Sequence, residues 1–255
     1  MTIVILGAGN IATHYAQAFH ALGHEIRQIY NRTSANAKAL ADVVSSTAID
    51  SLDELYLDAD LYIIAISDDY ISTVIEEMPN NIKGIVVHTS GATPLSVLYR
   101  FTNHGIIYPV QSLNKHIPYD LAQIPFAIEG NTKEVELLLL SLMQKIAPKT
   151  FPCNSNQRLA LHISAVFVNN FSNALFEVAH SILEKENLSF DLMKPIILET
   201  AMKVQKNPPR ATQTGPATRN DQSTMATHLK FLSYSNTLSE IYQIMSDLII
   251  KSRQK

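Results

Sequence analysis

Short apolar runs alternate with longer amphipathic segments over roughly the first 150 residues. The apolar runs are rich in Val and Ile and end at turn-forming residues, which is typical of buried strands. Strands are predicted within residues 2–6, 25–30, 46–49, 61–66, 84–89, 105–109, 125–130 and 149–153. Helices are predicted within residues 11–23, 34–44, 51–58, 70–78, 94–101 and 131–146. This alternation predicts an α/β fold with a Rossmann-type, doubly wound, mostly parallel sheet.

The pattern changes near Gln157, where strands stop and long helical periods begin. Residues 157–186 contain neither Gly nor Pro, which predicts one long helix. Further helices are expected within residues 190–206, 223–232 and 235–253, with Pro195 in a first turn or at a kink. The change predicts two domains, a Rossmann domain over residues 1–153 and an all-helical domain over residues 154–255.

A glycine-rich turn follows the first predicted strand. Gly7, Gly9 and Ala12 have G-x-G-x-x-A spacing, and a helix-forming stretch that ends at Gly23 comes next. In a dinucleotide-binding turn the first glycine allows the tight turn, the second lets the backbone approach a pyrophosphate, and the third small residue keeps helix and strand close. A turn without a ligand could have the same glycines. Because strand, turn and helix occur in the required order, we expect a dinucleotide site.

The second predicted strand indicates which dinucleotide binds. About 20 residues past the glycines, where NAD- or FAD-binding domains have a carboxylate for the ribose 2′-OH, this chain has Asn31. Arg32, Thr33 and Ser34 follow, and an Arg beside hydroxyls and a helix start can bind a 2′-phosphate. The same residues could also be an exposed Arg beside an ordinary helix N-cap. Since the acid is missing and a base is present, we expect NADP rather than NAD.

The composition argues against several classes of protein. The net charge of −3 and the pI of about 6.3 give no basic surface for nucleic acid. The one cysteine, Cys153, leaves no internal disulfide and no C-x-x-C metal or redox pair. The first strand begins at residue 2 and leaves no room for a signal peptide, and the longest apolar runs are too short to span a bilayer. We therefore expect a soluble, cytoplasmic protein without a metal site.

Polar residues follow three of the predicted strands, at the edge where doubly wound sheets bind ligands. These segments are Ser67–Asp69, Ser90–Ala92 and Tyr108–Ser112. We expect the first near the adenosine ribose and pyrophosphate, and the other two beside the nicotinamide. Asp68 and Asp69 are expected to cap a helix, because a carboxylate beside a phosphate would be repelled. Ser90 is the candidate ligand donor, while His88, inside a strand, is expected to be buried and hydrogen-bonded.

His162, Asn169 and Asn173 form a polar stripe on the predicted long helix. Seven residues, nearly two turns, separate His162 from Asn169, and Asn173 follows four residues later. Buried amides and imidazoles need hydrogen-bond partners, so the stripe marks either a helix–helix interface or an active site. In an active site His162 would protonate a developing alkoxide or amide, as carbonyl or imine reduction requires.

A last polar cluster lies in the irregular stretch of residues 207–221. Gly215 and Pro216 predict a rigid turn, and Asp221 is placed to cap the next helix. Arg219 could bind a substrate carboxylate bidentately or form a weak surface ion pair with Asp221.

Taken together, the motifs resemble those of a known family. GAGNIA, NRTS, ISDD, HTSGA, YPVQS, LHISAVFVNNF and TGPATRND occur in the order found in a family of Rossmann-like NADP-dependent oxidoreductases of uncharacterised function. The resemblance spans nearly the whole chain. Its wider relatives are pyrroline-5-carboxylate reductase, deazaflavin-dependent NADP oxidoreductase and the β-hydroxyacid dehydrogenases. It implies a helical domain like that of 6-phosphogluconate dehydrogenase, often dimeric, and a small-molecule substrate between the domains.

The chain departs from these relatives where the chemistry is decided. The dehydrogenases have a catalytic Lys four residues before an Asn of the long helix, whereas Ala165 precedes Asn169 here. The Gly-Gly-Thr-Thr-like segment of pyrroline-5-carboxylate reductase is also missing. Two hypotheses therefore stay open. One is an NADPH-dependent reductase of a small carbonyl or imine, and the other is a catalytically silent NADPH-binding sensor or scaffold.

The candidate residues fall into three groups. The catalytic candidates are His162 and Asn169. The substrate-binding candidates are Ser90, Tyr108, Gln111, Asn173 and Arg219. The cofactor-binding candidates are Gly7, Gly9, Asn10, Ile11, Asn31, Arg32, Thr33, Ser34, Ile66, Ser67 and Ser90. The apolar content of the helices within 157–186 and 191–206 exceeds what a small helical domain buries by itself, which predicts a homodimer.

Overall fold

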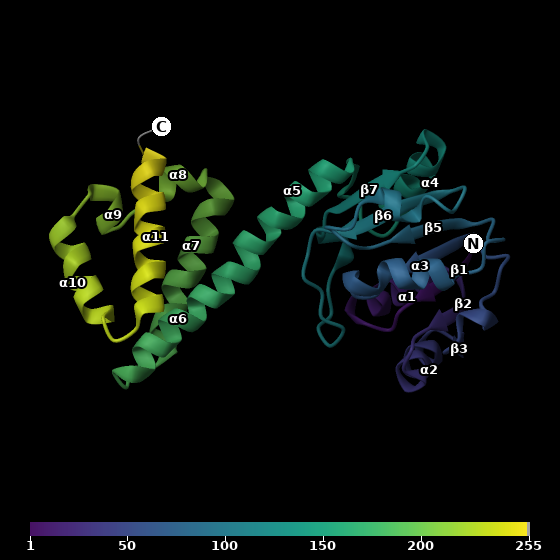
Figure 1. Cartoon of the computed structure of the whole chain (residues 1–255), viewed down its shortest axis with the longest axis horizontal. Helices are drawn as coiled ribbons and strands as arrows, with labels where there is room; N and C mark the ends of the chain where they lie inside the picture. The colour runs from purple at the N-terminus through teal and green to yellow at the C-terminus, as the bar shows by residue number, and fades with distance from the viewer. Residues whose placement is uncertain (254–255) are drawn as a thin grey trace. The chain divides into compact units, whose positions relative to one another are not determined.

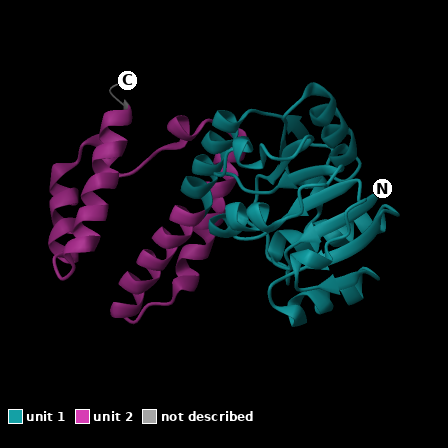
Figure 2. Cartoon of the chain, turned by 45° about the vertical axis from the view of Figure 1, so that its right-hand side comes forward, with its two compact units in different colours: residues 1–169 teal, residues 170–255 magenta. Residues whose placement is uncertain are grey.

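A computed structural model describes residues 1–253 and divides the chain into two compact units. Unit 1 is Met1–Asn169 and unit 2 is Asn170–Lys255, coloured separately in Figure 2. Helix α5 (Ser155–Ala165) begins just after the predicted domain boundary at residues 153 and 154 and belongs to unit 1. That boundary stays a prediction.

Within residues 1–169 the strands form one eight-stranded sheet, in the order β3-β2-β1-β4-β5-β6-β7-β8 (Figure 1). The strands are β1 (Thr2–Leu6), β2 (Glu25–Tyr30), β3 (Thr47–Ile49), β4 (Leu61–Ile64), β5 (Ile85–His88), β6 (His104–Pro109), β7 (Phe126–Gly130) and β8 (Thr150–Pro152). Strand β7 is antiparallel to β6, and the other neighbours are parallel. The predicted fold class is confirmed. The strand order reverses between β1 and β4, and doubly wound folds bind ligands at the carboxyl ends of the strands that flank such a reversal.

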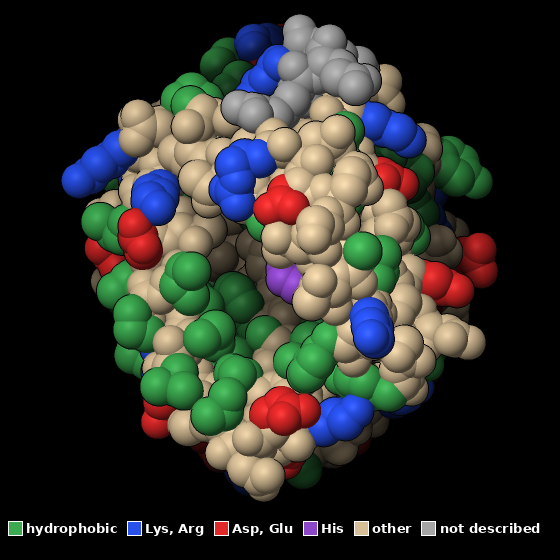
Figure 3. All heavy atoms as spheres, turned by 90° about the vertical axis from the view of Figure 1, so that its left-hand side faces the viewer, with side chains coloured by type: hydrophobic (Ala, Val, Ile, Leu, Met, Phe, Trp, Pro, Cys, Tyr) green, Lys and Arg blue, Asp and Glu red, His purple; other side chains and the backbone are tan. Residues whose placement is uncertain are grey.

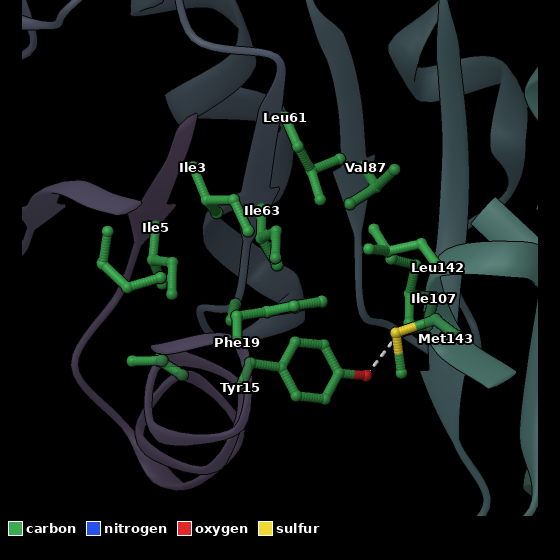
Figure 4. Close-up of a cluster of buried hydrophobic side chains, with 14 of the residues drawn as sticks. Ile3, Ile5, Tyr15, Phe19, Leu61, Ile63, Val87, Ile107, Leu142 and Met143 are labelled. Atoms are coloured by element: carbon green, nitrogen blue, oxygen red, sulfur yellow. Dashed lines mark hydrogen bonds between the residues drawn. The ribbon is translucent and has the colours of Figure 1, made fainter. Parts of the chain in front are cut away.

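Helices cover both faces of the sheet. Helices α1 (Asn10–Ala21), α2 (Ser34–Val43) and α4 (Lys133–Gln144) pack on one face, and α3 (Ile71–Glu77) packs on the other. Figure 4 shows the core of the first face, where Tyr15 extends from α1 towards the strands. Its hydroxyl donates a hydrogen bond of 2.9 Å to the carbonyl oxygen of Ile107. The ring can therefore be buried without leaving its polar group unsatisfied.

The helix predicted within residues 51–58 is wrong, because only the 3₁₀ turn η1 (Leu52–Glu54) forms there. Leu52 and Leu55 are both buried, and their spacing of three residues suits a 3₁₀ turn better than an α-helix. Residues 94–101 likewise contain a 3₁₀ turn, η3 (Leu95–Leu98). Both turns pack on the face covered by α3.

Residues 155–185 form one uninterrupted helical run, made of α5, the π-helix η5 (Val166–Phe171) and α6 (Ser172–Lys185). Asn154 and Gln157 form a capping box at its start, with two reciprocal hydrogen bonds of 2.9 Å. A π turn contains more residues than an α turn. The ideal α-helical spacing assumed for the polar stripe therefore does not hold through residues 166–171.

Among residues 1–253, this run is the one helix that could cross a membrane by length and composition, with a mean hydropathy of 1.3 over its most apolar 18 residues. Taken one at a time, the apolar runs of the sequence are too short to span a bilayer, which predicted no such helix. The helix is long enough because it joins several apolar runs across polar residues such as His162 and Asn169. Core helices of soluble proteins meet the same test, so this finding assigns no membrane.

Unit 2 continues after α6 with further helices. They are η6 (Phe190–Met193), α7 (Lys194–Lys206), α8 (Pro209–Thr212), α9 (Pro216–Arg219), α10 (Gln222–Leu232) and α11 (Asn236–Arg253). Pro195 lies in the first turn of α7, as predicted. A cavity of about 380 Å³ among α6, α9, α10 and α11 has mainly apolar walls. His228 and Tyr242 both line it, and His228 Nδ1 lies 2.8 Å from the Tyr242 hydroxyl. Figure 3 shows a hollow with apolar side chains to its left and below it, and a histidine inside.

A buried ion pair attaches α5 to the sheet. Arg158 is 1% exposed and pairs with Glu129 of β7, whose carboxylate also accepts hydrogen bonds from the backbone N–H and hydroxyl of Ser155. The other end of the guanidinium donates to the carbonyl oxygen of Thr93, in the loop after β5, at 2.6 Å. One arginine therefore joins the helix both to strand β7 and to the loop that follows β5.

Removing one partner of this pair should destabilise the fold strongly. We expect Glu129→Ala to lower the free energy of unfolding by about 3–5 kcal/mol, because it leaves a buried guanidinium unpaired. The exposed pair Lys38–Asp42 is the control, and Asp42→Ala should cost less than about 1 kcal/mol. Urea unfolding of both variants tests this, and equal small losses would contradict it.

Candidate functional site

The glycine turn between β1 and α1 fits a dinucleotide pyrophosphate. Gly7 has φ +126°, and a Cβ there would lie 2.2 Å from the carbonyl oxygen of Ala65. Gly9 differs, because a Cβ on it would meet no protein atom within 4 Å. Its backbone thus faces open space that a ligand can approach. Among the described residues no side chain caps the start of α1, which leaves its N–H groups for a phosphate.

The residues after β2 form a second anion-binding arrangement. The Arg32 guanidinium lies 5.4 Å from the centre of the Tyr70 ring. Asn31 Nδ2 donates to the carbonyl oxygen of Thr33 at 3.0 Å and orders the turn into α2. Thr33 is the N-cap residue of α2 but makes no capping hydrogen bond with its side chain, so the helix start remains accessible. This arrangement suits the 2′-phosphate of NADP.

Two further cofactor candidates, Ile66 and Ser67, follow β4. A side-chain carbon of Ile66 lies 3.2 Å from where a Cβ of Gly7 would stand, so Ile66 borders the glycine turn. Ser67 is exposed and is the N-cap residue of the 3₁₀ turn η2 (Asp68–Tyr70). The expectation that Asp68 caps this turn is wrong.

Asp68 instead holds the loop that follows β5. Its Oδ2 accepts a hydrogen bond of 2.8 Å from the hydroxyl of Ser90. The same hydroxyl accepts from the backbone N–H groups of Ala92 and Thr93, at 3.1 and 2.9 Å. The Ser90 hydroxyl thus donates its hydrogen within the protein and shapes the loop. Its predicted ligand contacts would have to use other atoms or a rearranged hydroxyl.

His88 is fully buried, as expected, and its Nδ1 accepts from the backbone N–H of Ser90 at 3.1 Å. Burial, with a smaller contribution from the charge of Arg158, lowers the pKa of His88 to about 4. The imidazole is therefore neutral near pH 7. It supports the loop and is a poor proton donor there.

Tyr108 and His162 lie side by side at the carboxyl edge of the sheet. The Tyr108 hydroxyl is 3.3 Å from His162 Nδ1, and the two rings meet edge to face with centres 6.0 Å apart. Gly91 makes room for this imidazole, since a Cβ on Gly91 would lie 2.7 Å from the ring. Burial raises the pKa of the Tyr108 hydroxyl, so it stays protonated near neutral pH.

Asn169 reaches the loop after β6. Its Nδ2 donates a hydrogen bond of 2.8 Å to the Ser112 hydroxyl. Gln111 is exposed in the same loop. His162 and Asn169 thus both contact residues near the end of β6, although a π-helix has begun between them.

Two predicted substrate residues belong to unit 2. Asn173 is exposed on α6, and Arg219 ends α9. Asp221 caps α10 as expected, and hydrogen bonds from Thr224, with a smaller contribution from Arg219, lower the pKa of its carboxyl. The roles of Asn173 and Arg219 stay predictions.

Sequence reasoning missed three supports of this site, namely Gly91, the Asp68–Ser90 bond and the pair Arg158–Glu129. A signal for the first two was present in the segments ISDD and HTSGA, which follow neighbouring strands. Arg158 was visible as the one Lys or Arg within residues 155–184. Its carboxylate partner, far away in sequence, was not.

The chain is similar to several known proteins. Residues 1–111 match a Rossmann-like domain, and residues 124–249 match a domain of unknown function, DUF2520. A "putative NADP oxidoreductase" from Bacteroides fragilis is 34% identical, with 98% of each chain covered and a TM-score of 0.87. A Thermotoga maritima protein is 21% identical, with 99% of this chain and 100% of that chain covered and a TM-score of 0.77.

An imine reductase from Myxococcus stipitatus, solved with NADP⁺, is 14% identical, with 100% of this chain and 94% of that chain covered and a TM-score of 0.70. At this identity the likeness concerns the fold. None of the curated proteins matches the chain.

Because His88 stays neutral in the folded protein, the free energy of unfolding should depend on pH in acid solution. Unfolded His88 takes up a proton below about pH 6.5, whereas the folded protein resists this down to about pH 4. Stability should therefore be complete above pH 6.5 and fall by up to about 3 kcal/mol as the pH drops to 4. In His88→Asn, which keeps an acceptor but does not titrate, this part of the pH slope should vanish. Urea unfolding at several pH values gives the free energy of unfolding of both proteins. If it falls equally steeply with pH in the wild type and in His88→Asn, the lowered pKa of His88 is refuted.

Proposed function

Because the chain belongs to the family that joins a Rossmann-like domain to a DUF2520 domain, we propose that it is an NADPH-dependent reductase of a small carbonyl or imine. The observation that carries the proposal is the contact between His162 and Tyr108 at the carboxyl edge of the sheet. This is the edge at which a doubly wound fold binds the reactive end of its cofactor.

The cofactor is supported by the glycine turn and the end of β2. The turn has an accessible backbone at Gly9 and an uncapped helix start, which suit a pyrophosphate. Arg32 and the start of α2 suit a 2′-phosphate. The relative from Bacteroides fragilis, named as an NADP oxidoreductase, agrees with this choice.

The proposed chemistry divides between the cofactor and His162. Bound NADPH would supply a hydride to the carbon of a C=O or C=N bond. His162 donates a proton to the oxygen or nitrogen as that atom gains the electron pair. Tyr108 engages Nδ1 of the imidazole, which leaves Nε2 as the nitrogen for the substrate. Gly91 allows the ring to approach the loop after β5.

Asn169 and the remaining polar residues would orient the substrate. Asn169 keeps its amide oxygen available while its nitrogen binds Ser112, so it can accept a hydrogen bond from a substrate amine or hydroxyl. Gln111 contributes from the same loop. For unit 2, taken by itself, the proposed roles are an amide contact from Asn173 and a carboxylate contact from Arg219.

A homodimer is also proposed, with a cytoplasmic location. Unit 2 exposes large apolar side chains on two of its helices. Ile196 and Leu198 of α7 are 58% and 64% exposed, and Ile244 and Leu248 of α11 are 66% and 58% exposed. Exposed apolar surface of this kind is typical of an interface between subunits. A second copy is the partner that the family resemblance favours.

A catalytically silent NADPH-binding protein is the alternative function. Ala165 favours it, because the dehydrogenases have their catalytic Lys at this position. The contact between His162 and Tyr108 favours the enzyme, because an imidazole at the carboxyl edge of the sheet can donate a proton to a substrate there.

Loss of the imidazole should affect turnover and leave cofactor binding intact. We expect His162→Ala to lower the rate of NADPH oxidation about 10²–10⁴-fold, with an unchanged NADPH dissociation constant. A panel of small keto acids and imines, followed by nicotinamide absorbance, gives the measurement. Ser164→Ala, an exposed position on the same helix, is the control. A wild-type chain that binds NADPH but turns over no substrate would instead support the silent protein.

Light scattering should give a mass twice the chain's 28.3 kDa at micromolar concentration. Leu198→Glu and Ile244→Glu should shift that mass towards one chain, because each would bury a charge at the interface. A monomeric wild-type protein would rule out the dimer.

A further inference from the structure

The loop between β6 and β7 is bound to the start of α1 by hydrogen bonds and a ring contact. Its residues 112–119, named here the strap, meet α1 at two successive turns. The backbone N–H of Lys115 donates to Oδ1 of Asn10 at 3.0 Å, and Nε2 of His14 lies 3.1 Å from the carbonyl oxygen of Asn114. The Tyr119 ring also meets the His14 ring edge to face, with centres 5.4 Å apart.

One buried side chain and one hydrogen bond within the strap also hold it in place. Leu113 is 7% exposed and packs in the core that α1 covers. The Tyr119 hydroxyl donates to the carbonyl oxygen of Ser112 at 3.3 Å. The position of the strap therefore depends on its backbone and on buried side chains, and none of these contacts uses the side chain of Lys115.

Lys115 itself is exposed beside the glycine turn. Its backbone nitrogen is bonded to Asn10, the first residue of α1, and a lysine ammonium reaches roughly 6 Å from its Cα. No ion pair found within residues 1–253 includes Lys115. The ammonium is thus available to a ligand at the start of α1.

The start of α1 alone does not neutralise the negative charge of the cofactor's pyrophosphate, and Lys115 can compensate the remainder. A helix start offers only about half a positive charge, whereas both phosphates of a pyrophosphate are negative. Arg32 is placed against Tyr70 after β2, where the 2′-phosphate is expected, and Arg158 is buried against Glu129. The strap brings a separate cation to the pyrophosphate end.

We propose that the ammonium of Lys115 binds the pyrophosphate of the dinucleotide in a charge-assisted contact. The inference rests on the proposed cofactor and deepens it. Lys115 then determines how tightly either dinucleotide binds, because the pyrophosphate is common to NADPH and NADH. Arg32 determines which dinucleotide is preferred, because the 2′-phosphate occurs in NADPH alone.

Titrations of the full chain with NADPH, NADH and ADP-ribose test this division. Lys115→Ala keeps the backbone bond to Asn10 and should weaken all three ligands by a similar factor, about threefold to tenfold. The loss should shrink as salt is added, and Lys115→Arg should restore most of the affinity. Arg32→Ala should weaken NADPH about tenfold and leave NADH unchanged. Lys83→Ala, an exposed lysine at the opposite edge of the sheet, is the control for net charge.

Unchanged affinities in Lys115→Ala, with an unchanged thermal midpoint, would overturn the inference. A loss confined to NADPH would also overturn it, because it would place Lys115 at the 2′-phosphate. A wild-type chain that binds none of the three ligands would overturn the cofactor and this inference together. Normal binding without turnover would leave the inference intact and count against the proposed reductase.

Discussion

The buried pair between Arg158 and Glu129 fixes the candidate site in space. A helix can rotate and slide on a sheet as long as its contacts are apolar, but a guanidinium bonded to a carboxylate and a carbonyl allows one orientation. His162 follows Arg158 by four residues and therefore lies on the same face of α5. Arg158 contacts Thr93, and His162 packs against Gly91 in the same loop. The ion pair thus sets how α5 is rotated about its own axis, and the contact of His162 with Tyr108 depends on that rotation.

Glycine serves two different purposes around the crevice. At Gly7 and Gly91 another part of the protein occupies the space that a side chain would need. At Gly9 that space is open, although the backbone has an ordinary negative φ. A glycine that neither the backbone conformation nor the packing requires points to a partner from outside the chain. The dinucleotide motif therefore has one member whose role appears only when a ligand is considered.

Local patterns predicted the strands well because each strand is an apolar run bounded by turn residues. The sequence failed at three places, and a distant contact explains one of them. Residues 51–58 have helical spacing, yet burial of Leu52 and Leu55 limits them to a 3₁₀ turn. Asp68 has the sequence position of a cap, yet the Ser90 hydroxyl from the next strand's loop engages its carboxylate. The spacing of the polar stripe assumed an α-helix, and no local signal revealed the π-helix at 166–171.

The sole sulfhydryl of the chain lies where the sheet passes into the long helix. Cys153 directly follows β8 and is buried in a small core with Ile106, Tyr108 and Ala127, and burial raises the pKa of its thiol. A thiol reagent can therefore modify it only when this junction opens. The rate of modification would report the local opening free energy beside Tyr108, without a label or a mutation. Cys153 is therefore a native probe of local opening in the core that contains Tyr108, one member of the candidate catalytic pair.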